Sequence, residues 1–157
     1  MAVNINQSNS EIYFGDLKVV TAAVYPGDVV VPNYVTGDCN APASDGAADL
    51  GGLALVCNYD PYADTDMTNS SAYDVHIGEY ARLKALLVGD VITTDRFIGT
   101  YSAITVGDIF AVNGTTGTGS LGKWVAIGVR TSALQAVVVE KTTLYGNNAL
   151  MLRIIAA

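Results

Sequence analysis

The stretch Leu87-Val88-Gly89-Asp90-Val91-Ile92 decides the fold class, because it places a Gly-Asp pair between two apolar runs. The same pattern occurs at Tyr25-Pro26-Gly27-Asp28-Val29-Val30 and, with threonine in the first apolar position, at Thr105-Val106-Gly107-Asp108-Ile109-Phe110. Glycine tolerates a positive φ angle, and aspartate accepts hydrogen bonds from nearby backbone N–H groups, so Gly-Asp favours a tight turn before a strand. Such pairs also suit a cation or phosphate site, but turns in a β domain are the preferred interpretation.

The runs on either side of these turns predict a protein built mainly from short strands. β-Branched residues and glycine are frequent, as is typical of β structure. Residues 79–88, EYARLKALLV, fit a helix that ends at Gly89, but their alternation of apolar and polar residues favours a strand. Trp124 is predicted to lie in the core. The other predicted strands lie within residues 17–31 and at residues 53–59, 91–97, 104–112, 123–130, 134–141 and 149–155.

The predicted fold is therefore mainly β, a small β-barrel or β-sandwich-like domain with two additions. Residues 1–15 begin with a polar run and end in Ile12-Tyr13-Phe14-Gly15, which predicts an N-terminal arm with an apolar anchor. Residues 16–157 predict one β-rich domain that contains an acidic, loop-rich insertion at about residues 33–75. An excursion of that length is usually functional or forms an interaction.

Composition argues against several classes of protein. The 157 residues are 50% hydrophobic and only 15% charged, which is the reverse of a disordered chain. The net charge of −7 opposes binding to phosphate, so nucleic acid is not an expected partner. No apolar run reaches the roughly 18 residues of a membrane helix, so a membrane is not expected either. The first residues lack the basic and apolar regions of a signal peptide, which predicts that the chain stays in the cytoplasm where it is made.

The acidic residues are concentrated in one part of the chain. Residues 19–81 contain nine Asp or Glu and no Lys or Arg, whereas residues 82–157 contain seven Lys or Arg and four Asp or Glu. This asymmetry predicts that the basic, apolar half docks on a partner. The acidic half is expected to face solvent or to pair with a basic neighbour.

The sequence contains no recognisable active site. His76 is the only histidine, and no nucleophile-elbow pattern or Gly-rich phosphate loop accompanies it, so it is interpreted as a solvated or capping residue. Cys39 and Cys57 are the only cysteines, and with one histidine they match no metal-ligand spacing. Two free thiols are favoured over a disulfide in a cytoplasmic protein, but the sequence leaves the pairing open. No enzymatic activity, cofactor or resident metal is expected.

One acidic segment raises the alternative of calcium binding. Asp64, Asp66 and Thr68 have the spacing of the first ligands of an EF-hand loop. Asn69 stands where that loop requires glycine, and Val75 stands where its last glutamate is expected. Calcium binding by the loop from Asp60 to Asp66 therefore stays open, with a solvated acidic loop as the preferred interpretation.

Aromatic and apolar residues predict contact surfaces. Tyrosines lie beside Asn, Asp, Ser and Thr in the acidic region, a composition typical of protein interfaces and carbohydrate sites. The last strand is apolar on both faces except at Arg153, and the chain has more hydrophobic residues than a small domain usually buries. Self-association or docking on a larger assembly would cover this surface. The predicted contact residues are Ile12, Tyr13, Phe14, Tyr59, Tyr62, Tyr73, Leu152, Arg153 and Ile154.

The C-terminal half resembles a known family. Gly107-Asp108-Ile109, Ile127-Gly128-Val129 and Leu152-Arg153-Ile154 match a Gly-Asp-apolar turn, an Ile-Gly-Val strand and a terminal apolar-Arg-apolar strand. With these motifs the chain resembles the small β-domain cement or decoration proteins of tailed bacteriophage heads, over about half of its length. The resemblance implies binding to the outside of the expanded capsid lattice, often as a trimer at local threefold axes, without catalytic residues.

The leading hypothesis is therefore a viral structural protein that binds and stabilises an icosahedral phage capsid. Its expected partner is the major capsid protein, its expected state is a homo-oligomer, with a trimer favoured, and its expected place is the virion surface. One alternative is another virion component, such as a head-fibre base or tail protein, that binds a host glycan through Tyr59, Tyr62 and Tyr73. A soluble β module that binds calcium or another ligand is a further alternative.

Overall fold

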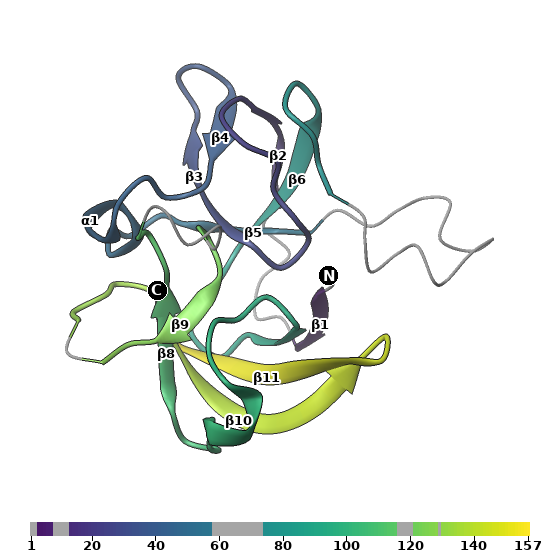
Figure 1. Cartoon of the computed structure of the whole chain (residues 1–157). Helices are drawn as coiled ribbons and strands as arrows, with labels where there is room; N and C mark the ends of the chain where they lie inside the picture. The colour runs from purple at the N-terminus through teal and green to yellow at the C-terminus, as the bar shows by residue number, and fades with distance from the viewer. Residues whose placement is uncertain (1–2, 8–12, 58–73, 116–120, 129) are drawn as a thin grey trace.

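The computed structural model describes residues 3–7, 13–57, 74–115, 121–128 and 130–157, and these form a mainly β protein (Figure 1). The described residues contain eleven strands, which build a closed five-stranded barrel and a six-stranded sheet. A short helix, α1 (Asp45–Ala48), and a 3₁₀ turn at Tyr101–Ala103 accompany them. This architecture confirms the predicted fold class of a small β-barrel or β-sandwich-like domain.

The closed barrel has the spatial order β2-β4-β3-β5-β6. Its strands are β2 (Tyr13–Val19), β3 (Val29–Asn33), β4 (Asp38–Asn40), β5 (Ala54–Val56) and β6 (Tyr80–Ala85). Neighbouring strands are antiparallel, except that β2 and β4 run parallel. Alternate side chains of all five strands, such as Val19, Val30 and Leu83, are buried together in the barrel interior.

The second sheet has the order β1-β7-β11-β10-β8-β9. Its strands are β1 (Val3–Gln7), β7 (Val91–Thr94), β8 (Ile109–Val112), β9 (Trp124–Ala126), β10 (Gln135–Leu144) and β11 (Asn147–Ala156). This sheet curls back on itself, because the residues after β7 return to β9. Trp124 N donates to Arg96 O at 2.9 Å and Ile98 N donates to Trp124 O at 2.7 Å, while Phe97 and Trp124 form a parallel bridge.

The two halves of the chain share one topology. If β2 to β6 are matched in order with β7 to β11, the order of the closed barrel becomes β7-β9-β8-β10-β11. The second sheet has the same order of neighbouring strands once the link from β7 to β9 is included. The strand directions agree as well, since the links β2–β4 and β7–β9 are both parallel and the others are antiparallel. The protein is therefore a tandem of two barrels. We call the described residues from 13 to 86 barrel 1 and those from 87 to 157 barrel 2; β1 pairs with β7 of barrel 2.

The sequence retains a trace of this repeat. Residues 23–33 and 103–113 align at a constant offset of 80, and Ala23, Gly27, Asp28 and Asn33 recur as Ala103, Gly107, Asp108 and Asn113. The two Gly-Asp pairs also bond to equivalent strands. Gly27 N donates to Val56 O of β5 at 2.9 Å, and Gly107 N donates to Val138 O of β10 at 2.8 Å.

The structure confirms the Gly-Asp pairs as tight turns. The φ angles are 93° at Gly27, 97° at Gly89 and 100° at Gly107, in the region that favours glycine. In each turn the aspartate accepts a hydrogen bond from the backbone N–H three residues earlier, at 2.8–3.0 Å. A fourth turn before β6 has the same geometry with glutamate, because Glu79 Oε2 accepts a bond from His76 N at 2.9 Å.

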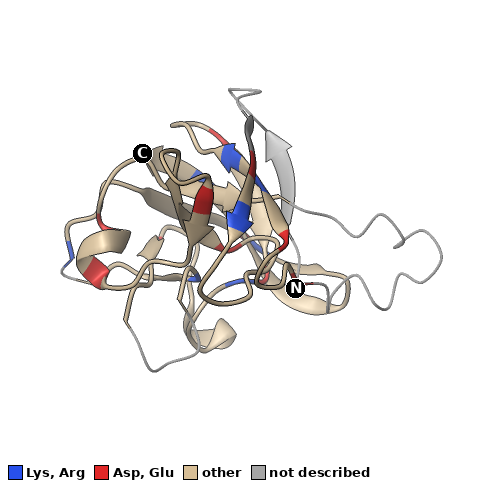
Figure 2. Cartoon of the chain, turned by 90° about the horizontal axis from the view of Figure 1, so that it is seen from above, with Lys and Arg blue, Asp and Glu red and all other residues tan. Residues whose placement is uncertain are grey.

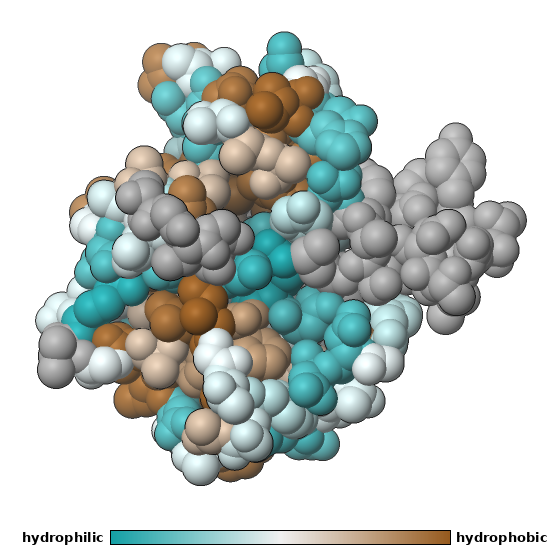
Figure 3. All heavy atoms as spheres, in the orientation of Figure 1, coloured by the Kyte–Doolittle hydropathy of each residue, from teal (hydrophilic) through white to brown (hydrophobic). Residues whose placement is uncertain are grey.

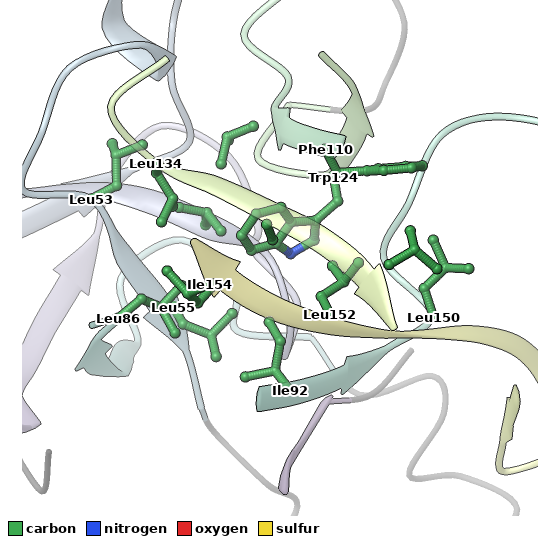
Figure 4. Close-up of a cluster of buried hydrophobic side chains, with 14 of the residues drawn as sticks. Leu53, Leu55, Leu86, Ile92, Phe110, Trp124, Leu134, Leu150, Leu152 and Ile154 are labelled. Atoms are coloured by element: carbon green, nitrogen blue, oxygen red, sulfur yellow. The ribbon is translucent and has the colours of Figure 1, made fainter. Parts of the chain in front are cut away.

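A hydrophobic core joins the two barrels (Figure 4). Strands β3 and β5 contribute to it with the face that points away from the interior of barrel 1. Val29 and Leu55 on that face pack against barrel 2 residues that include Phe110 and Trp124. Trp124 is fully buried, which confirms its predicted place in the core. Because both faces are covered here, β5 and the first three residues of β3 are apolar.

The structure alters two predicted boundaries and confirms one ambiguous element. Residues 33–57 of the predicted insertion contain β4 and β5, which are both strands of barrel 1. β5 confirms the strand predicted at residues 53–59, whereas β4 lies where a loop was predicted. Within the predicted arm, residues 3–7 form β1 and pair with β7, and β2 begins at Tyr13. Residues 80–85 form β6, so the prediction of a strand there is confirmed.

Candidate functional site

A buried ion pair lies where the two barrels meet. Arg96 Nε donates to Asp28 Oδ1 at 2.6 Å, and Arg96 Nη2 donates to Asp28 Oδ2 at 3.0 Å. The exposed fractions are 2% for Asp28 and 6% for Arg96. The Arg96 guanidinium also lies 4.4 Å from the centre of the Tyr25 ring, in cation–π geometry. Burial raises the pKa of the Asp28 carboxyl, although the hydrogen bonds and charge of Arg96 act in the opposite direction.

Further ion pairs connect the two barrels. Lys84 Nζ of β6 lies 3.9 Å from Asp90 Oδ2 in the turn before β7, and both side chains are buried. Arg130 of barrel 2 binds Asp49 and lies 3.4 Å from Asp45 Oδ1, next to α1 of barrel 1. Figure 2 shows acidic and basic segments intermingled along the ribbon. For part of the acidic stretch, the predicted basic neighbour is therefore the second barrel of the same chain.

The histidine and the acidic residues do not form a metal centre in the described part of the chain. The His76 side chain is 67% exposed, and its Nδ1 lies 3.3 Å from Asp74 Oδ2. This placement confirms His76 as a solvated residue of a turn. No three His, Cys, Asp or Glu side chains among the described residues are grouped so that they could hold a metal ion. The predicted calcium segment from Asp60 to Asp66 lies outside the described residues.

The two cysteines are both free thiols. Cys39 is buried inside barrel 1, and Cys57 lies partly buried against the core between the barrels. Burial raises the pKa of Cys39 to about 11 and the pKa of Cys57 to about 12. Because the thiolate is the reactive form of cysteine, neither side chain has the properties of a catalytic or redox-active thiol.

We expect both thiols to react slowly in the native protein. At a pH of about 8, these pKa values leave about one molecule in a thousand or fewer in the thiolate form. Ellman's reagent should therefore titrate both thiols rapidly only after denaturation. Serine replacement at Cys39 or Cys57 assigns any residual native signal, and a rapid native reaction of either thiol would contradict its buried position.

The predicted contact residues lie in different environments. Leu152 and Ile154 are fully buried, so their prediction as contact residues is wrong. They lie on the face of β11 that packs in the core, while Arg153 between them is exposed. Tyr13 and Phe14 belong to β2. The remaining predicted contact residues lie outside the described part of the chain: Ile12, Tyr59, Tyr62 and Tyr73.

A cluster of large exposed hydrophobic side chains covers one end of barrel 1. The β3–β4 loop, the end of β2 and the turn before β6 meet there, because Lys18 N donates to Gly37 O and Gly78 N donates to Val19 O. Figure 3 shows hydrophobic side chains gathered at this end, at the top of the view. We call this cluster the apical patch. Its members and their exposed fractions are Val20 (42%), Tyr34 (56%), Val35 (96%), Ile77 (60%) and Tyr80 (59%).

A second apolar feature is a hollow of about 220 Å³ between the two barrels, which we call the seam hollow. Its lining includes Leu53 from barrel 1, Leu86 and Leu87 from the β6–β7 connection, and Leu134 from barrel 2. None of its lining side chains is charged. Three of these leucines also belong to the core, so the hollow extends the core towards the surface.

The sequence does not reveal these two surfaces, although it contains one signal for exposed aliphatic residues. The turns before β6, β7 and β8 have Ile77, Val88 and Val106 at their second position, and these side chains are 58–64% exposed. An aliphatic residue that precedes Gly-Asp or Gly-Glu in these turns is therefore exposed to solvent. Residues 34–35 carry no comparable signal.

Among the described residues, no helix is long and apolar enough to span a membrane. The chain matches no protein-family model, no curated protein and no solved structure.

Proposed function

We propose that the protein is a non-enzymatic structural component of a virion that binds the outer surface of an icosahedral phage capsid and stabilises it. One observation carries the proposal: ion pairs are buried between the barrels, whereas aliphatic side chains are exposed at turns held by hydrogen bonds. A rigid β scaffold with exposed apolar contact points suits attachment to a protein surface. The resemblance of the C-terminal half to cement proteins supplies the identity of that surface.

The turn before β8 illustrates how such a contact point is built. Val106 is 64% exposed at the second position of this turn. Asp108 holds the turn, because it accepts hydrogen bonds from Thr105 N and Thr105 Oγ1, both at 2.8 Å. These bonds lower the pKa of Asp108, so the carboxylate that fixes the turn stays ionised at neutral pH. A contact point that is ordered before binding loses little conformational entropy when it docks.

Co-sedimentation with expanded, empty heads of the phage that encodes the chain tests this proposal. The wild-type protein should bind, and Val106→Asp should weaken binding by about tenfold, because it removes apolar burial and places a charge in the contact. Ser102→Asp is the matched control, because Ser102 is exposed in the same barrel. This substitution adds the same charge without removing apolar surface.

The salt dependence of attachment gives a second measurement. Raised salt should weaken attachment only modestly, because apolar burial is expected to provide most of the binding energy. Complete release at moderate salt, or no binding of the wild-type protein to heads, would contradict the proposed function.

A further inference from the structure

Within one chain, barrel 2 already docks on barrel 1 through the loop between β8 and β9. Gly114 N donates to Asp45 Oδ1 at 3.0 Å, and Thr115 Oγ1 lies 3.1 Å from Asp45 Oδ2. The backbones approach so closely that a Cβ atom on Gly114 would lie 2.0 Å from Ser44 O. Ser44 and Asp45 belong to the β4–β5 connection. The contact therefore joins the loop after the second strand of one barrel to the connection between the third and fourth strands of the other.

The equivalent loop of barrel 1, residues 34–37, presents apolar side chains to solvent. Val35 is 96% exposed, the largest exposed fraction among the large hydrophobic side chains of the described chain. The loop is nevertheless held in place, because Asn33 Oδ1 accepts a hydrogen bond from Val35 N at 3.1 Å. In barrel 2, Asn113 Oδ1 accepts the corresponding bond from Thr115 N at 3.4 Å. The exposed loop thus shares its local anchoring with a loop that docks.

The equivalent connection of barrel 2 contributes one residue to the seam hollow, whose lining comes mostly from barrel 1. It links β9 to β10 through residues 127–134, and Leu134 lines the hollow. The volume of about 220 Å³ is below the roughly 300–1,000 Å³ of pockets that hold drug-sized ligands, but it can accept an aliphatic side chain of a protein. Since the hollow continues the core between the barrels, an inserted apolar side chain would extend an existing hydrophobic interface.

We propose that a second copy of this chain occupies the seam hollow. Loop 34–37 of that copy inserts into the hollow, and its Val35 side chain fills the hollow. The contact repeats between molecules the loop-to-connection contact that joins the two barrels within one molecule. It is heterologous, because the apical patch and the seam hollow are different surfaces, and such contacts form rings when the rotation between copies closes. The inference does not depend on capsid binding, since it concerns the purified protein alone.

The mass of the protein in solution provides the first test. The wild-type protein should sediment as an oligomer, and Val35→Asp should return it to the 16.4 kDa of a single chain. Gly51→Leu should have the same effect, because Gly51 lines the hollow and its Cβ position has open space, so the leucine fills the hollow without straining the fold. Tyr145→Asp, at the 54% exposed tip of the β10–β11 hairpin, is the matched control and should leave the mass unchanged.

Disulfide trapping distinguishes the proposed contact from a symmetric one. Val35→Cys and Leu87→Cys proteins should form a cross-linked dimer when they are mixed and oxidised, but neither variant should do so alone. Wild-type protein under the same conditions controls for Cys39 and Cys57. Cross-linking of Val35→Cys with itself would show that apical patches meet each other. That result would overturn the proposal. A wild-type protein that stays a single chain at all concentrations, or a Val35→Asp variant that still forms the oligomer, would also overturn it.

Discussion

Arg96→Ala is expected to lower the free energy of unfolding by about 3–5 kcal/mol. The substitution leaves the Asp28 carboxylate, which is only 2% exposed, without the guanidinium that binds both of its oxygens. A protein of this kind is stable by only about 5–15 kcal/mol, so the variant should lie close to its unfolding limit. Urea denaturation measures the change, with fluorescence of the only tryptophan, the fully buried Trp124, as the signal.

An exposed ion pair of the same protein provides the control for Arg96→Ala. Arg82 Nε lies 3.8 Å from Asp16 Oδ1, and the two side chains are 51% and 55% exposed. Arg82→Ala should therefore change the unfolding free energy by less than about 1 kcal/mol. The double variant Asp28→Leu/Arg96→Met should recover much of the loss, because it removes both charges of this pair and leaves neither one buried alone. Equal losses in Arg82→Ala and Arg96→Ala would contradict the role of the buried pair in joining the barrels.

Local structure in this protein follows from local sequence. Each Gly-Asp pair predicts a turn, because a positive φ angle and a carboxylate acceptor are both available within four residues. Alternation predicts the strand at residues 80–85, since Ala81 and Leu83 face the interior of barrel 1. The same alternation places Lys84 on the solvent side, yet Lys84 is buried. Its partner, Asp90, lies in a turn of the other barrel, so a one-dimensional pattern gives no sign of it.

Barrel closure and the repeat depend on contacts between distant segments, which sequence patterns do not report. β4 has only three residues, too few for a periodic signal. It also lies in a stretch rich in Gly, Ala and Asp, and that composition predicts a loop. The repeat keeps only four identities within residues 23–33, so it becomes visible only when the strand order of both barrels is known. Likewise, Asp28 and Arg96 are 68 residues apart in the sequence, so no local pattern predicts that they form an ion pair.

Composition predicts that this protein has an exposed apolar surface, but it does not say which residues form it. The terminal strand β11 has a run of hydrophobic residues interrupted only by Arg153, and in the sequence this run predicts an exposed apolar contact surface. In the structure, the strand buries one face in the core, which includes Leu150, Leu152 and Ile154. The large exposed hydrophobic residues lie instead mostly in turns and loops, as Val35 does. A substitution on β11 therefore tests whether its apolar side chains form part of the core or part of a contact surface.

Leu152→Ala is expected to lower the free energy of unfolding by about 2–5 kcal/mol, because the fully buried side chain leaves a cavity in the core between the barrels. Arg153→Ala removes an exposed side chain from the same strand and should change it by no more than about 0.5 kcal/mol. If Leu152 were a contact residue, its variant would fold with wild-type stability and lose only self-association or capsid attachment. Urea denaturation of both variants, followed by Trp124 fluorescence, decides between these outcomes. Because the two residues are neighbours on β11, the difference between the variants reports the burial of Leu152 and not a property of the strand.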